Sequence, residues 1–152
     1  SFLLSRRAAL ASFAAFAAVP AFAADRVNIV ATTGMIADLV RQIGGSAVTV
    51  QGLMGAGVDP HGYRQTRSDI VAMTRSDATF WHGLFLEAQM EAFFEDLARK
   101  RPVHAVAETL DRSELLAHED YEGRFDPHIW MDPTLWAQCA PAVVEALEIV
   151  RN

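Results

Sequence analysis

From Val27 to the C-terminus, the apolar residues switch repeatedly between the spacing of a strand and the spacing of a helix. The strand-like runs are residues 27–31, 48–53, 78–81 and 103–107. The helix-like runs are residues 35–43, 66–74, 87–99 and 134–150, the last of which Pro141 should kink or split. Short links between alternating elements predict an α/β fold, with a parallel β-sheet covered by helices on both faces.

The first 23 residues have the pattern of a cleaved export signal. Arg6 and Arg7 precede an apolar stretch rich in Ala and Phe, and Ala21-Phe22-Ala23 gives the small-x-small pattern of a cleavage site. The alternative is a membrane anchor, for which this stretch is short and interrupted by Pro20. We therefore expect a signal peptide at 1–23 and a periplasmic protein, which does not span the membrane once the signal is removed.

Composition excludes several classes of protein. A chain of 152 residues suffices for one domain with a core. The formal charge of −6 argues against a nucleic-acid partner, because phosphate binding needs clustered Lys and Arg. The single cysteine, Cys139, rules out an internal disulfide and a multi-cysteine metal cage, and its apolar neighbours predict a small buried side chain.

The same tripeptide occurs in two loops that follow predicted strands. Asp59-Pro60-His61 follows the second strand, and Asp126-Pro127-His128 follows the long polar stretch after the fourth. Ligands of parallel α/β sheets bind beyond the carboxyl ends of the strands, and imidazole is the commonest neutral metal ligand. Proline would stiffen each loop, and the aspartate could orient the imidazole ring. Alternatively, each Asp-Pro is a simple turn and each histidine a solvated loop residue.

The other candidate residues have plainer interpretations. His82 follows a predicted strand, where a histidine packed in the core is favoured over a metal ligand. We interpret His104 and His118 as structural or solvated residues. Glu87 begins a predicted helix, where the helix dipole favours a carboxylate. Trp130 and Trp136 are expected to pack around the second loop.

Common catalytic signatures are absent from the sequence. The chain has no Gly-x-Ser-x-Gly elbow, no His-Glu-x-x-His motif and no phosphate-binding Gly-Lys-Ser/Thr. We therefore expect a protein that is not an enzyme and has no catalytic cofactor.

Three segments resemble the metal-specific substrate-binding proteins of bacterial ABC importers. They are VATTGMIADLVRQIGG, GLMGAGVDPHGY and DPHIWMDP. The resemblance implies two α/β lobes that close around one metal ion, with His61 and His128 as the ligands of the first lobe. Gly83-Leu84-Phe85-Leu86-Glu87 matches a further family segment, and we expect Glu87, Asp59 and Asp126 next to the ligands rather than among them. Residues 24–152 would form the N-terminal metal-binding lobe, and the sequence stops before the lobe that supplies the remaining ligands.

The function implied by this resemblance is the capture of Zn²⁺, Mn²⁺ or Fe²⁺ and its delivery to the permease of an ABC importer. Zinc-binding members often carry a His-rich insertion, whereas residues 108–127 contain only His118, which favours manganese or iron. We expect a monomer. A metal-dependent hydrolase with a His-bound ion and a metal-free adhesion lobe remain as alternatives.

Overall fold

A computed structural model describes residues 26–152, so the predicted signal peptide lies outside the described residues. Four parallel strands form a sheet in the order β2-β1-β3-β4. They are β1 (Val27–Ala31), β2 (Val48–Gly52), β3 (Ala78–Trp81) and β4 (Val103–Ala105). The predicted parallel α/β fold is confirmed, although β4 is shorter than expected.

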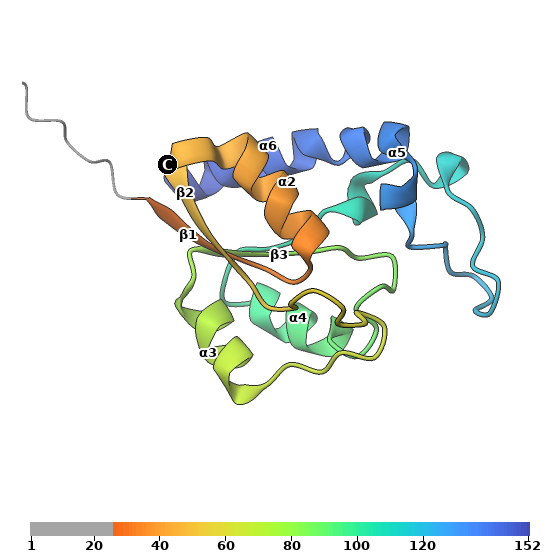
Figure 1. Cartoon of the computed structure of the whole chain (residues 1–152), viewed down its shortest axis with the longest axis horizontal. Helices are drawn as coiled ribbons and strands as arrows, with labels where there is room; N and C mark the ends of the chain where they lie inside the picture. The colour runs from red at the N-terminus through yellow and green to blue at the C-terminus, as the bar shows by residue number, and fades with distance from the viewer. Residues whose placement is uncertain (1–25) are drawn as a thin grey trace, which may run out of the picture.

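Helices cover both faces of the sheet (Figure 1). They are α2 (Gly34–Gly44), α3 (Arg67–Arg75), α4 (Glu91–Ala98), α5 (Pro133–Gln138) and α6 (Ala140–Arg151). On one face, α2 and α6 pack with Ile29 and Phe80, and on the other α3 and α4 pack with Val30. Because neighbouring residues of β1 point to opposite faces, one strand contributes to both cores.

Local sequence signals explain where several helices begin. Thr66 and Asp69 form a reciprocal capping box at the start of α3. The side chain of Asp132 accepts the free N–H groups that follow Pro133 at the start of α5. The predicted break at Pro141 is confirmed, because α5 ends at Gln138 and α6 begins at Ala140.

The segment between β3 and α4 differs from the prediction. The sequence predicted a helix from residue 87, but α4 begins at Glu91. Gly83, Leu84 and Phe85 all have positive φ, at 85°, 51° and 68°, and the carboxylate of Glu87 accepts hydrogen bonds from the backbone of this turn. The backbone N–H groups of Leu86 and Met90 then bond three residues back, to Gly83 and Glu87, so residues 84–90 form turns and the α-helix begins after them.

The loops that follow the strands gather at one edge of the sheet. Residues 53–66 follow β2, His82 follows β3, and the long connection from 106 to 132 follows β4. All of them leave the carboxyl ends of parallel strands, so residues far apart in the sequence meet there. No helix within residues 26–152 has the length and apolar character needed to cross a membrane.

Candidate metal centre

The two Asp-Pro-His loops adopt the same hydrogen-bonded turn. In each loop, Oδ1 of the aspartate accepts the backbone N–H of the histidine two residues later, at 2.9 Å for Asp59 and His61 and at 2.9 Å for Asp126 and His128. Proline between them fixes one backbone angle and has no N–H to compete for the carboxylate. The tripeptide therefore holds each histidine backbone in a defined position.

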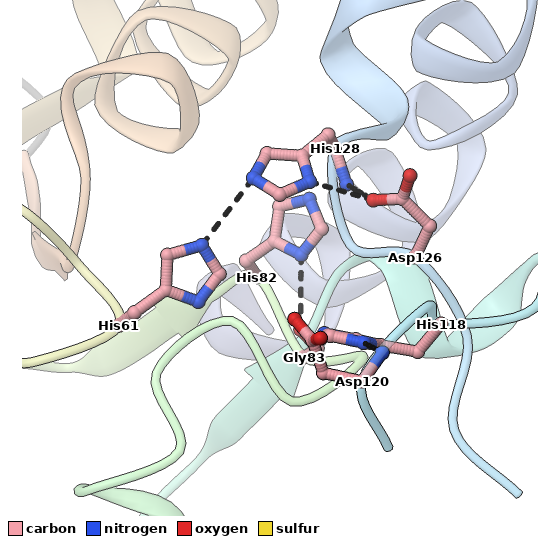
Figure 2. Close-up of polar contacts among 7 residues, drawn as sticks. All are labelled: His61, His82, Gly83, His118, Asp120, Asp126 and His128. Atoms are coloured by element: carbon pink, nitrogen blue, oxygen red, sulfur yellow. Dashed lines mark hydrogen bonds and ion pairs between the residues drawn. The ribbon is translucent and has the colours of Figure 1, made fainter. Parts of the chain in front are cut away.

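The two histidine rings face each other across the edge of the sheet (Figure 2). Nε2 of His61 lies 3.3 Å from Nε2 of His128, and the ring planes are inclined by 50°. Two nitrogens bound to tetrahedral Zn²⁺ at about 2.05 Å lie about 3.3 Å apart. The two Nε2 atoms thus have the separation of two ligands on one ion.

The carboxylate of Asp126 also orients the ring of His128. Its Oδ1 lies 2.6 Å from Nδ1 of His128, and its hydrogen bond from the His128 backbone lowers the pKa of the carboxyl group. An ionised acceptor at Nδ1 favours the tautomer with the proton there. Nε2 of His128 then carries the lone pair on the side of His61, as a metal ligand must.

Beside this pair, His82 is fully buried. Its Nδ1 lies 3.0 Å from the carbonyl oxygen of Gly83 (Figure 2). Burial lowers the pKa of the imidazole to about 4. The ring of Trp130 contacts both His82 and His128, with centroid distances of 5.4 and 5.1 Å. The ring of Trp136 is nearly parallel to that of His82, with a centroid distance of 6.3 Å. The predicted packing of His82 and of both tryptophans is confirmed.

Glu87 makes its hydrogen bonds to Thr32, His82 and Gly83, and none of them reaches His61 or His128. Its fully buried carboxylate accepts hydrogen bonds from the Thr32 hydroxyl at 2.6 Å, from the His82 N–H at 2.9 Å and from the Gly83 N–H at 3.3 Å. Burial raises the pKa of this carboxyl group. Glu87 therefore joins the ends of β1 and β3, and its contact with the centre runs through the segment that carries His82.

The remaining candidates lie outside the pair. Nδ1 of His118 accepts the backbone N–H of Asp120 at 3.0 Å. His104 is half-buried in β4, and Cys139 is fully buried as predicted. Within residues 26–152, no cluster of three or more His, Cys, Asp or Glu side chains could hold a metal ion. The described part of the chain thus offers two ligands that meet, His61 and His128.

The lobe is a parallel α/β sheet, and its two facing imidazoles lie beyond the carboxyl ends of the strands. Proteins of this class bind a small ligand in the loops that follow the strands. Residues 29–151 match the family model described as "Zinc-uptake complex component A periplasmic". The chain belongs to this family.

Individual relatives agree with this membership. The chain is 42% identical to the zinc-binding protein TroA of Treponema pallidum over 133 residues, which cover 88% of this chain and 42% of TroA. The solved TroA structure superposes with a TM-score of 0.76 over 81% of this chain and 44% of that one. Manganese-binding lipoprotein MntA of Bacillus subtilis is 37% identical over 74% of this chain and 36% of MntA.

A third relative is named as a component of a transporter. It is the manganese ABC transporter substrate-binding lipoprotein ScaA of Streptococcus gordonii, 29% identical over 71% of this chain and 36% of ScaA. The chain therefore spans less than half the length of each of these relatives. The relatives are named as metal-binding or transport proteins and none of the three as an enzyme.

Proposed function

We propose that this chain is the N-terminal metal-binding lobe of an extracytoplasmic substrate-binding protein. The protein captures a divalent transition metal, Zn²⁺, Mn²⁺ or Fe²⁺, and delivers it to the permease of an ABC importer. The observation that carries this proposal is the pair of Nε2 atoms 3.3 Å apart, held by two loops of the same sequence. Membership of the family, whose relatives are named for zinc or manganese, supports the same function.

In this proposal the chain captures the ion and catalyses no reaction. Neutral imidazoles replace water molecules around the ion, and a second lobe supplies the remaining ligands. A hydrolase would need a free carboxylate beside the ion as a general base. The carboxylates of Glu87 and Asp126 already accept hydrogen bonds from their neighbours, which favours capture over hydrolysis. The proposal includes residues 1–23 as a cleaved export signal that directs the protein to the periplasm.

Calorimetric titration of the chain with Zn²⁺ and with Mn²⁺ tests this function. We expect binding that weakens as the solution is acidified, because protonated imidazole cannot ligate a metal. The double variant His61→Ala/His128→Ala should lose more than about 100-fold in affinity, since even outer groups around a metal contribute up to that much.

His118→Ala is the matched control, because it removes an imidazole outside the pair. It should bind the metal as the unchanged chain does. Equal binding heats from the double variant and the unchanged chain would overturn the proposed function.

A further inference from the structure

The loop that carries His61 is held at its two ends and lies at the surface between them. Residues 55–62 are all exposed or half-buried. Within residues 26–152, their hydrogen bonds join them only to one another, apart from the contact of the His61 ring with His128. The position of His61 therefore depends on the residues where this loop meets the rest of the lobe.

Met54 and Tyr63 anchor the two ends of this loop in the same core. The backbone N–H of Met54 donates to the carbonyl oxygen of Thr32 at 2.9 Å, and its side chain belongs to the buried cluster that contains Val30. The ring of Tyr63 packs against the same cluster. Two residues of chain span at most about 7 Å, so a shift of Tyr63 is passed directly to His61.

The hydroxyl of Tyr63 fixes its end of the loop to α3. It donates to Oδ2 of Asp69 at 2.7 Å. The same oxygen accepts the backbone N–H and the hydroxyl of Thr66, at 2.7 and 2.8 Å, as part of the capping box that begins α3. A hydrogen bond to a carboxylate is stronger than one between neutral groups. Tyr63 is thus tied to a helix at a point two residues from His61.

The loop that carries His128 has separate supports. The carboxylate of Asp126 contacts the ring of His128, and the next residue, Ile129, is buried in the same cluster as Val143 of α6. This cluster lies on the other face of the sheet from the one that receives Tyr63. Tyr63 therefore supports one histidine of the pair and not the other.

We infer that Tyr63 is a positioning residue for metal capture, which holds His61 at the separation from His128 that one ion requires by bonding to Asp69. This inference rests on the proposed metal site. Without the bond, the loop also adopts positions in which the two Nε2 atoms are not 3.3 Å apart. The apparent affinity then falls in proportion to the fraction of chains in which the pair is formed.

Calorimetric titration of Tyr63→Phe with Zn²⁺ tests the inference. The variant keeps the ring in the core and removes only the hydroxyl. We expect zinc affinity to fall by about 10-fold, near the lower end of what a hydrogen bond to a charged group contributes, with one ion still bound per chain. Tyr121→Phe is the matched control, because Tyr121 is 52% exposed and its ring contacts Phe85 and His118 rather than the pair. It should bind zinc as the unchanged chain does.

Two further variants separate positioning from general stability. Val143→Ala removes buried atoms from the core on the other face of the sheet, so it should lower the free energy of unfolding and leave zinc affinity unchanged. Asp69→Asn weakens the bond to Tyr63 from its other end. Tyr63→Phe/Asp69→Asn should therefore lose no more affinity than the weaker-binding of the two single variants.

The outcomes distinguish this inference from the proposed function. Zinc affinity of Tyr63→Phe equal to that of the unchanged chain would overturn the inference and leave the metal site intact, whereas failure of the unchanged chain to bind zinc would overturn both. An equal loss in Val143→Ala would show that affinity follows overall stability, and the positioning role would be wrong. Losses from Tyr63→Phe and Asp69→Asn that add in the double variant would exclude their hydrogen bond as the cause.

Discussion

At the scale of single residues, the two Asp-Pro-His loops differ by one hydrogen bond. Asp59 and Asp126 both accept the backbone N–H of their histidine, but Asp126 also lies 2.6 Å from the Nδ1 atom of its ring. That contact favours one tautomer and makes Nε2 more basic. In the proposed site, Asp126 therefore orients the ring of His128, whereas His61 is positioned by its backbone and by the facing ring.

The first prediction compares Asp126→Ala with Asp59→Ala. Both changes remove the turn, but only Asp126→Ala removes the hydrogen bond to the ring. We expect Asp126→Ala to lower zinc affinity by about 10- to 100-fold, the usual effect of an outer partner of a ligating histidine, and Asp59→Ala to lower it less. Calorimetric titration measures both. Equal losses would contradict the role given to the Asp126 side chain.

A second residue effect concerns the stability of the fold at low pH. Burial lowers the pKa of His82 from 6.5 to about 4, so the unfolded chain binds a proton there that the folded chain does not. Stability therefore falls as the pH drops from about 6.5 to about 4. The shift corresponds to a loss of about 3 kcal/mol in the free energy of unfolding at pH 4 relative to pH 7.

The second prediction is that His82→Asn removes this pH dependence. The variant should be less stable than the unchanged chain at pH 7, because the smaller side chain loses the ring contacts of His82 with Trp130 and Trp136. The difference in the free energy of unfolding between the unchanged chain and His82→Asn should be about 3 kcal/mol smaller at pH 4 than at pH 7. Urea unfolding at the two pH values measures it. A difference that stays constant with pH would show that burial of His82 does not control acid stability.

At the scale of elements, the turn between β3 and α4 combines an unusual backbone conformation with hydrogen bonds from two acidic side chains. Three successive residues, Gly83 to Phe85, are left-handed. The carboxylate of Glu87 accepts the N–H of Gly83, and that of Glu108 accepts the N–H of Leu84 at 2.8 Å. Arg112 pairs with Glu108 in turn. The carboxylates of Glu87 and Glu108 thus hold the backbone turn that directly follows His82.

The third prediction follows from the crowding at Gly83. A Cβ atom there would lie 2.7 Å from Cγ of Glu108 and 3.3 Å from Cβ of Ala105, at a φ of +85°. Gly57 has a similar φ of +80° with no heavy atom within 4 Å of such a Cβ. Gly57→Ala should therefore cost only the left-handed strain, about 1–2 kcal/mol. Gly83→Ala should cost about 1–3 kcal/mol more, because Glu108 must move.

Urea unfolding of the two alanine variants measures this comparison. The pair is matched because both glycines are left-handed and only one is crowded. Equal destabilisation would mean that Glu108 yields freely and that the turn is held by backbone conformation alone.

At the scale of the whole molecule, the parallel sheet brings His61 and His128, which are 67 positions apart in the sequence, to the same edge. The alternation of strand and helix patterns predicted this sheet. The repeated Asp-Pro-His tripeptide predicted which two loops would meet. Both predictions rest on local signals, namely apolar spacing and a motif that acts through its own backbone. The capping pair Thr66–Asp69 and the break at Pro141 were predictable for the same reason.

Features that depend on tertiary contacts were not predictable from the sequence. Glu87 looked like the start of a helix, but its hydrogen bonds to Thr32, His82 and Gly83 require β1 and β3 to be neighbours. The contact of Trp130 with both His82 and His128 likewise joins segments after different strands. Nor does the sequence distinguish Asp59 from Asp126, because the tripeptides are identical and the orientation of each ring depends on its surroundings.

The central claim is that Nε2 of His61 and Nε2 of His128 bind one metal ion. The most direct test is a Zn²⁺ titration of the chain with ¹⁵N-labelled histidine, followed by NMR of the ring nitrogens. The Nε2 signals of His61 and His128 should shift together as zinc binds, with the proton of His128 remaining on Nδ1, while the nitrogens of His104 and His118 do not shift. Unchanged Nε2 signals at His61 and His128, or zinc binding at any other histidine, would contradict the claim.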